Sequence, residues 1–391
     1  MKWVYSARRA FWLRRRLLRL FRGSLALTAV LVSLGITGVL LGIMALNLGQ
    51  KSGSEPRPGT FGSVLSRYEM YMTNSLSDAL EGVLSIEKVY WLSDEDSVCP
   101  EPEQSCYGES DDPGVLEELI REAEPLLGGQ KLYFEPYRDR KPGTSVRYYL
   151  DETIFALAWK EIHDGCVYTF SEVKIRHPSQ IRRLLSGGAY GSGQQLLTTE
   201  MSQSVNAVVA SSGDFYAYRR YGAVVWNGKL HRAYNGGLDL CLVDDNGDLL
   251  VLRSWEVPVE AELQRYIEEN NVRFSLAFGP VIVMDGEQVY TGAYPVGENA
   301  DNFSRAAICQ MDTLHYLLCS ANMEYGYPMV PTLNQFASHL AATGCRTAYT
   351  LDGGQTAAIA MNDALVNQVS YGSQRRISDI LYFATAVPDG G

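Results

Sequence analysis

The chain has 391 residues, of which 46% are hydrophobic and 20% are charged. This composition excludes an intrinsically disordered or coiled-coil protein. The formal net charge is −11, and residues 1–51 hold nine basic residues and no acidic one, so the remainder carries 25 basic against 45 acidic residues. Because so acidic a surface repels a phosphate backbone, we expect no nucleic acid partner.

Residues 24–48 form an uncharged stretch of 25 residues preceded by eight basic ones. About 20 residues suffice to cross the hydrocarbon core, and the positive-inside rule then keeps a basic tail in the cytoplasm. A cleaved signal peptide is the alternative, but its apolar region is usually about 7–15 residues long and ends in small residues. The sequence therefore predicts a signal anchor in a single-pass type II protein of the plasma membrane. Its cytoplasmic tail is residues 1–23, its bilayer contact is residues 24–48, and its C-terminal part is extracytoplasmic.

The exported part divides by composition into a linker (49–60), an N-terminal extension (61–145) and a main domain (146–388). All seven cysteines lie in this part, where an oxidising compartment permits disulfides. Seven is an odd number, so at least one thiol has no partner within the chain. Cys99 and Cys106 close a short loop rich in Pro and Glu, and we expect a local disulfide between them.

The predicted elements alternate irregularly along the chain. Helices are expected after Asp112-Pro113 up to Gly128-Gly129, from Pro178 to 185, and over 258–270 and 332–342. Strands are expected over 148–159, 167–175, 207–218, 222–234, 238–253 and 275–290, and Asn-Gly and Asp-Gly pairs in the last three segments suit tight hairpin turns. Strands dominate and no regular strand–helix alternation occurs. The predicted fold class is therefore α+β, a mixed or antiparallel sheet with a few packed helices, preceded by one N-terminal transmembrane helix.

Several catalytic signatures are absent from the sequence. It has no GxSxG elbow, no HExxH motif and no phosphate-binding loop ending in Lys-Ser/Thr. No histidine has a partner at metal-ligand spacing. A peptidase or esterase is therefore not indicated.

The informative segment is 347–362, TAYTLDGGQTAAIAMN. A predicted strand runs into Asp352, Gly353 and Gly354 follow, and a second strand leaves. This arrangement places a carboxylate at a strand end beside backbone N–H groups exposed by two glycines, which suits a ligand with hydroxyls or phosphate oxygens. An ordinary Asp-Gly hairpin turn has the same pattern, so the residues alone leave both interpretations open.

The order of motifs over residues 145–386 resembles the phosphodiester glycosidase family. The segments that carry the resemblance are ASSGDFY (210–216), AFGP (277–280), SRAAICQ (304–310), GCRTAYTLDGGQTAA (344–358) and RRISD (375–379). The fourth is the most specific, because it is similar to the family's Asn-Leu-Asp-Gly-Gly-Gly-Ser-Ser signature. The chain departs from the family at Ser212, which stands where Asn is common, at Gln355 and Thr356, which replace Gly and Ser, and at Cys309, which replaces Gly.

The resemblance implies hydrolysis of a sugar-1-phosphodiester between the anomeric carbon and a phosphate oxygen, in a surface glycopolymer or glycoconjugate. A phosphate monoester leaves more easily than a sugar alkoxide, so one well-placed carboxylate can suffice. Asp352 and Asp214 would flank the sugar, one of them as base or nucleophile. Arg305 would hold the phosphate, helped by Arg376 and the N–H groups of Gly353 and Gly354. Substrate contacts are also expected from Ser212, Gly213 and Gln355.

Two of these assignments have simpler explanations from the residues alone. Arg305 is equally well explained by a surface ion pair, and Asp214 by a turn after Gly213. The altered motif positions also leave a second function open, that of a non-catalytic glycopolymer-binding or assembly protein of the same fold. The metal ligands are unknown and the sequence indicates no definite cofactor, although acidic residues at strand ends allow a structural Ca²⁺.

Overall fold

The computed structural model describes residues 91–93, 98–289, 292, 294 and 303–388, all within one unit of the chain, Glu87–Gly391. Outside the described residues lie the predicted tail (1–23), the predicted anchor (24–48), the predicted linker (49–60) and residues 61–90 of the predicted extension. Within the described part, no helix has the length and apolar character needed to span a membrane.

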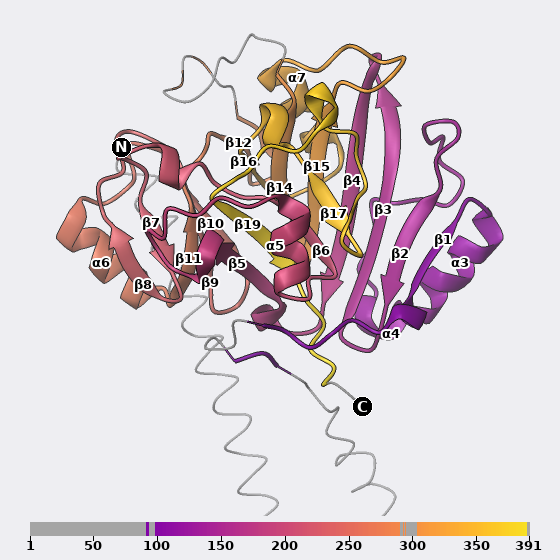
Figure 1. The fold of residues 1–391 in the computed structure, drawn as a ribbon, viewed down its shortest axis with the longest axis horizontal. Coiled ribbons are helices and arrows are strands. Elements are labelled where there is room, and N and C mark those ends of the chain that lie inside the picture. Colours follow the sequence, from indigo (N-terminus) through magenta and orange to yellow (C-terminus); the bar gives the residue numbers. More distant parts are fainter. Residues whose placement is uncertain (1–90, 94–97, 290–291, 293, 295–302, 389–391) are drawn as a thin grey trace, which may run out of the picture. The chain divides into compact units, whose positions relative to one another are not determined.

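The largest element is a nine-stranded sheet in which every neighbouring pair is antiparallel (Figure 1). Its two longest strands, residues 154–163 and 166–175, are rich in β-branched and aromatic residues, which suit a pleated, buried surface. In spatial order the strands are β1 (Tyr107–Ser110), β2 (Val146–Leu150), β3 (Ile154–His163), β4 (Cys166–Ile175), β15 (His315–Asn322), β14 (Arg305–Asp312), β16 (Thr347–Leu351), β12 (Val281–Met284) and β13 (Glu287–Gln288).

Both faces of this sheet are buried. Along β3, Leu157 and Trp159 belong to one hydrophobic core, whereas Ala156 and Ala158 belong to a second core on the opposite face. The first face is covered by the helices α3 (Pro113–Glu122), α4 (Glu124–Leu127) and α7 (Leu333–Ala342). The second face packs against a layer of smaller sheets. For this reason all ten residues of β4 are buried, and its apolar–polar alternation does not separate a core side from a solvent side.

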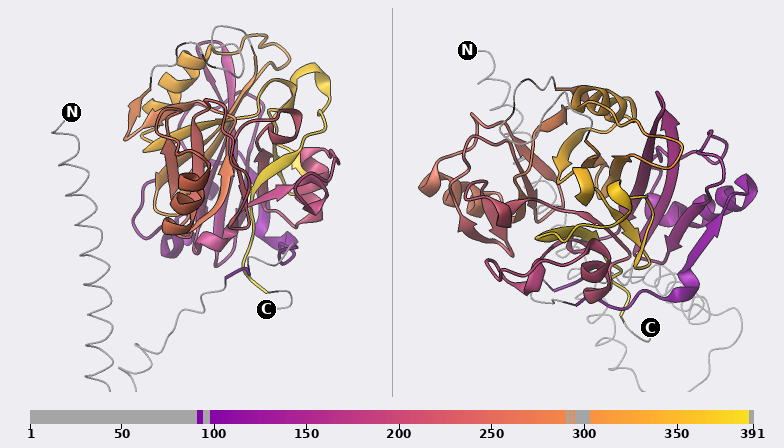
Figure 2. Two further views of the ribbon diagram at one scale, coloured as in Figure 1. Left: turned by 90° about the vertical axis from the view of Figure 1, so that its left-hand side faces the viewer. Right: turned by 45° about the horizontal axis from the view of Figure 1, so that its top comes forward.

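The second layer contains three smaller antiparallel sheets. The five-stranded sheet has the order β18 (Ala364–Leu365), β17 (Ile359–Met361), β6 (Val209–Ser212), β19 (Asp379–Phe383) and β5 (Ile181–Leu185). The others are β10 (Leu249–Leu252), β9 (Leu240–Asp244) and β11 (Val272–Leu276), and the hairpin of β7 (Val224–Trp226) and β8 (Lys229–Arg232). The helix α5 (Thr198–Ser204) contacts β6 and β19. The helix α6 (Glu260–Glu269) lies at the opposite end of the described part from α3 (Figure 1, Figure 2). The predicted α+β class with antiparallel sheets is confirmed.

Three predicted elements were wrong in part or whole; one is the strand expected over 207–218, which ends at Ser212 and is followed by a 3₁₀ turn, Tyr216–Tyr218. The single strand expected over 148–159 is a hairpin of β2 and β3, because the Asp151 carboxylate accepts the N–H groups of Thr153 and Ile154 and turns the chain. The helix expected from Pro178 ends after one 3₁₀ turn, Pro178–Gln180, and residues 181–185 are the strand β5. Pairing with β19 overrides the helical spacing of the local sequence.

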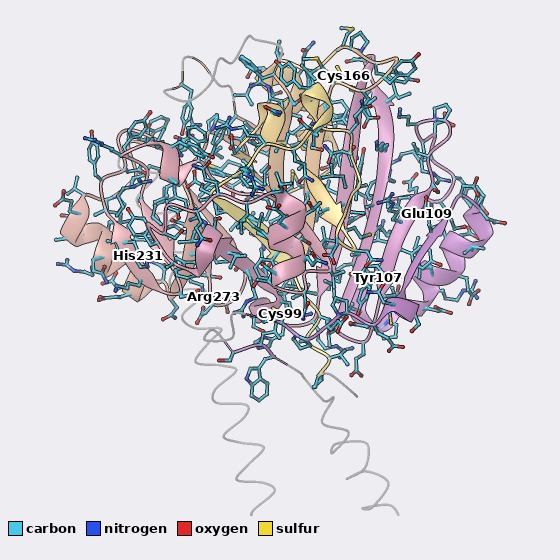
Figure 3. The ribbon with its side chains drawn as sticks, viewed as in Figure 1. Cys99, Tyr107, Glu109, Cys166, His231 and Arg273 are labelled. Carbon is cyan, nitrogen blue, oxygen red and sulfur yellow. The ribbon has the colours of Figure 1, made fainter. Side chains whose placement is uncertain are left out.

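The expected disulfide between Cys99 and Cys106 is not formed. All seven cysteines lie among the described residues, and none of them is in a disulfide. Cys99 Sγ lies 3.9 Å from Tyr382 Oη, and its backbone N–H donates to the Val205 carbonyl oxygen. Cys99 and Cys166 lie near opposite ends of the described part (Figure 3).

A buried acidic residue, Glu324, contacts segments that are far apart in the sequence. The Glu324 side chain is 2% exposed and forms ion pairs of 2.8 Å with Lys141 and 2.7 Å with Lys160. It also accepts the Gln368 N–H at 3.3 Å. Burial raises the pKa of Glu324, but the hydrogen bonds from the two lysines outweigh burial, and the pKa lies below its ordinary value of 4.5.

Glu324→Gln should destabilise the protein by about 2–3 kcal/mol at neutral pH, because it leaves two largely buried lysines without a counter-charge. A depressed carboxyl pKa contributes stability above the unfolded-state pKa, and this contribution is lost as the pH falls through the folded-state value. The difference between parent and variant should therefore shrink below about pH 4.5. Urea unfolding at several pH values measures both effects.

The matched control is Glu118→Gln, which removes an exposed pair with Arg121. It should change stability by less than about 1 kcal/mol. An equal effect of the two substitutions would contradict the account.

Candidate active site at the end of β16

The turn predicted to hold the site follows β16. Asp352 and Gly353 leave the strand, and a 3₁₀ turn, Gly354–Thr356, leads to β17. The Asp352 N–H donates to the Gly213 carbonyl oxygen at 2.9 Å, and Ser212 Oγ donates to the Asp352 carbonyl oxygen at 3.0 Å. The structure therefore joins two predicted motifs that lie 140 residues apart in the sequence.

A cavity of about 140 Å³ lies beside this turn. Asp352, Gly353 and Gly354 line one side, and Arg305 at the start of β14 lines another. The remaining wall is mostly apolar and includes Phe278, Pro280, Phe303 and Leu333. The cavity therefore combines one carboxyl and one guanidinium group with a mostly apolar wall.

The two glycines of the turn have different roles. A Cβ at Gly353 would lie 2.5 Å from the Ser304 carbonyl oxygen, so no larger residue fits there. The Gly354 N–H donates to that same oxygen at 2.7 Å. Only the Gly353 N–H is left without an acceptor among the described residues, whereas both N–H groups were expected to face a ligand.

Asp352 is buried, and no described residue brings a cation into direct contact with its carboxyl group. The residue lines the cavity, and its buried Oδ2 atom has no hydrogen-bond partner among the described residues. Burial is the main cause that raises the pKa of Asp352 to about 7. A hydrogen bond from Thr356 and the charge of Arg375 lower the pKa, while the charges of Asp379 and Asp214 raise it. A carboxyl group with this pKa exchanges a proton readily at neutral pH.

Arg183, Asp379 and Asp214 form a buried ion network near Asp352, on three neighbouring segments of one sheet. Arg183 of β5 donates from Nε to Asp379 Oδ2 of β19 at 2.8 Å, and its Nη2 lies 3.5 Å from Asp214 Oδ2. Asp379 Oδ2 also accepts the Asp214 N–H at 3.0 Å. A Cβ at Gly213 would lie 2.4 Å from that oxygen, so glycine is required where β6 ends.

Asp214 is enclosed by donors and does not line the cavity. Its carboxylate accepts Arg219 Nη2 at 2.8 Å, the Phe215 N–H at 2.5 Å and the Ala277 N–H at 3.0 Å. Its residue surface is 1% exposed. This position differs from the expected one beside the sugar, because the carboxylate already has its full set of partners.

The three arginines near the site differ in their surroundings. Arg305 lines the cavity and donates from Nε to the Pro331 carbonyl oxygen at 3.4 Å. Arg376 is paired with Glu200 at 2.9 Å, on the exposed surface, and the structure does not bring it to Asp352. Arg375 is exposed, stacks on the rings of Phe215 and Tyr218, and is near enough to lower the Asp352 pKa. Within the described residues Arg375 has no hydrogen bond or ion pair.

Sequence reasoning named Arg376 for the site, whereas the structure brings its neighbour Arg375 near enough to Asp352 to lower the pKa. Both arginines lie in the segment RRISD (375–379), which ends in Asp379. Arg183 gave no usable signal, because it lies in the segment predicted as a helix. Gln355, expected at the substrate, donates instead to the Ser373 carbonyl oxygen at 3.1 Å.

The described residues contain no group of three or more His, Cys, Asp or Glu side chains placed to hold a metal ion. Calcium binding stays a prediction of the sequence.

Asp352→Asn should change the pH dependence of stability. A carboxyl group whose pKa is raised in the folded state contributes stability that is present below its unfolded pKa of about 3.8 and lost as the pH rises through about 7. The asparagine variant lacks this loss. The free energy of unfolding of the variant, relative to that of the parent, should therefore increase by about 2–3 kcal/mol as the pH rises from about 5 to about 8.5.

Urea unfolding of both proteins across this range measures the effect. Asp285→Asn, at an exposed turn, is the control and should follow the parent. Parallel curves for Asp352→Asn and the parent would show that Asp352 does not titrate near neutrality.

Comparison with known proteins identifies this region. The model of the family described as phosphodiester glycosidase matches residues 205–384. No curated protein sequence matches the chain. The catalytic domain of zebrafish N-acetylglucosamine-1-phosphodiester alpha-N-acetylglucosaminidase is 16% identical, with a TM-score of 0.47, and the match covers 59% of this chain and 83% of that chain. The crystal structure of a hypothetical protein from Synechocystis is 14% identical, with a TM-score of 0.48, and the match covers 62% of this chain and 64% of that chain. The resemblance to the phosphodiester glycosidase family predicted from the sequence is therefore confirmed over residues 205–384.

Proposed function

We propose that the protein hydrolyses a sugar-1-phosphodiester at the cavity beside Asp352. The observation that carries the proposal is the state of this residue: it lines the same cavity as Arg305, its buried carboxyl group has a pKa near 7, and one carboxyl oxygen has no hydrogen-bond partner among the described residues. The family match supports the substrate class, because the matching family is that of phosphodiester glycosidases.

In the proposed reaction the bond between the anomeric carbon and the phosphate oxygen breaks, and a water oxygen takes its place on the carbon. The leaving group is a phosphate monoester, which needs little protonation, so the second carboxyl of an ordinary glycosidase is dispensable. Asp352 acts in its ionised form, either by taking the proton of the attacking water or by attacking the carbon as the phosphate leaves, in which case water then hydrolyses the glycosyl ester and restores the carboxylate. Its pKa keeps that form abundant at neutral pH while leaving it basic enough to act.

The phosphate is held by Arg305 and Arg375 and by the N–H group of Gly353. Arg305 lines the cavity, and Arg375, which lies over two aromatic rings outside the cavity lining, is near enough to lower the Asp352 pKa. Guanidinium groups suit this role because they neutralise the charge that develops on the leaving phosphate.

Asp214 and Asp379 are positioning residues in this proposal. Neither lines the cavity, and both are held by Arg183. Their charges raise the pKa of Asp352, and their hydrogen bonds fix the end of β6, whose Gly213 carbonyl oxygen binds the Asp352 N–H. Ser212 fixes the same turn from the other side.

The proposed setting is extracytoplasmic. Residues 24–48 would anchor the chain in the plasma membrane with a cytoplasmic tail of residues 1–23, and the substrate would be a surface glycopolymer or glycoconjugate. The uncharged stretch and the basic residues before it support this setting. A structural Ca²⁺ is compatible with such a compartment.

Arg375→Ala and Arg305→Ala should each lower kcat/KM by about a hundredfold, because each removes a cation that stabilises the leaving phosphate. Arg376→Ala is the matched control: the neighbouring residue is equally charged but paired with Glu200, and its removal should leave kcat/KM within about threefold of the parent. Release of sugar from the methyl diester of N-acetylglucosamine-1-phosphate, followed by NMR, measures the rates. A larger loss in Arg376→Ala than in Arg375→Ala would contradict the arrangement.

The pH dependence of kcat/KM should report Asp352. Because the ionised carboxylate acts, kcat/KM should rise about tenfold per pH unit on the acid side and level off above about pH 7. Asp352→Asn should abolish sugar release while the protein stays folded. A kcat/KM that decreases as the pH rises through 7 would show instead that Asp352 acts in its protonated form, as a general acid. Tight saturable binding of glycopolymer with no release by the parent would favour the alternative function, a glycopolymer-binding or assembly protein.

A further inference from the structure

A second cavity, of about 570 Å³, lies beside β5. Its volume is within the roughly 300–1,000 Å³ typical of small-molecule sites. It is lined by residues of β5, by the β7–β8 turn, by β11 and by the end of α6, and it shares no residue with the cavity at Asp352. Arg273, which lines it, and His231 of β8 lie on the α6 side of the molecule in Figure 3.

The cavity contains an aromatic ring with a fixed orientation. Trp226 at the end of β7 is half-buried, and its Nε1–H donates to the Arg183 carbonyl oxygen at 2.9 Å. The His231 ring lies 6.2 Å from the indole. A ring held in this way loses little freedom when a flat, apolar surface packs on it, as one face of a pyranose does.

The cations of this cavity are already engaged. Arg183 binds Asp379, and Arg273 donates from Nη1 to the Pro178 and Ile181 carbonyl oxygens at 2.7 and 3.2 Å. Arg182 donates to Tyr382 Oη at 3.2 Å. Arg182 and Arg273 therefore already have oxygen acceptors, and Arg183 is paired with a carboxylate.

The exposed polar groups around the cavity are carboxylates and amides. Asp245 and Glu268 are exposed acids that would repel a phosphate or another anion. Asn227 and Asn271 are exposed, and neither amide side chain has a hydrogen-bond partner among the described residues. Carboxylates and amides together accept and donate hydrogen bonds to hydroxyl groups.

We propose that this cavity, which we call the Trp226 cleft, binds a neutral oligosaccharide, with one sugar ring on Trp226 and its hydroxyls on Asp245, Glu268, Asn227 and Asn271. The cleft is a binding site separate from the Asp352 cavity. The inference does not depend on hydrolysis, because it rests on the shape, aromatic ring and charges of a different cavity.

The test is isothermal titration of the full-length protein, in a zwitterionic detergent without a sugar headgroup, with the tetramers of N-acetylglucosamine and of maltose-type glucose. Binding of at least one tetramer is expected, weakened at least tenfold in Trp226→Ala and in Glu268→Arg. The second substitution places a long cation at an exposed helix position and blocks the cleft without altering the core, so it keeps the test valid if Trp226→Ala does not fold.

Two controls separate the Trp226 cleft from the Asp352 cavity. Trp255→Ala removes an indole that is 75% exposed and stacked on Arg253, and it should leave binding unchanged. Asp352→Asn should also bind normally. Absence of binding to both tetramers, or binding lost in Asp352→Asn but kept in Glu268→Arg, would overturn the proposal. Tetragalacturonate, which is anionic, should bind at least tenfold more weakly, and equal binding would contradict the charge argument.

Discussion

The arrangement of the site depends on the pairing of Arg183 with Asp379 and Asp214. These three side chains are buried, on three segments that adjoin in one sheet. Removing charges from water costs several kcal/mol per ion, and only close pairing with further hydrogen bonds offsets that cost. Here the bonds are present: Ser378 Oγ and backbone N–H groups complete the carboxylates, and Arg183 also donates to the Ser275 carbonyl oxygen.

The same pairing explains why Asp352 is different from its neighbours. Asp379 and Asp214 take the nearest guanidinium groups, so Asp352 is buried beside two negative charges with no cation in contact. Its proton affinity follows from burial first and from these neighbours second. One cluster of charges thus holds the strands in register, while the carboxyl outside the cluster remains available for chemistry.

Local signals in the sequence were sufficient for some elements. Asp112 caps α3 by accepting the Gly114 N–H, and Thr332 caps α7 by accepting the Gln335 N–H. The turn at Asp352 also lies between two strands, as its glycines predicted. Each of these features is decided by residues within a few positions of one another.

Features decided by distant residues were not predictable in the same way. The strand β5 is set by pairing with β19, and Arg183 meets Asp379 across 196 residues of sequence. Periodicity in a seven-residue segment cannot report such a partner. The choice between Arg375 and Arg376 depends likewise on Glu200, which draws one guanidinium to the surface.

The most direct test of the account is a crystal structure of the Asp352→Asn protein with an intact sugar-1-phosphodiester. The account predicts the anomeric carbon beside residue 352 and the phosphate between Arg305 and Arg375. A substrate bound away from this turn, with its phosphate on neither arginine, would contradict it.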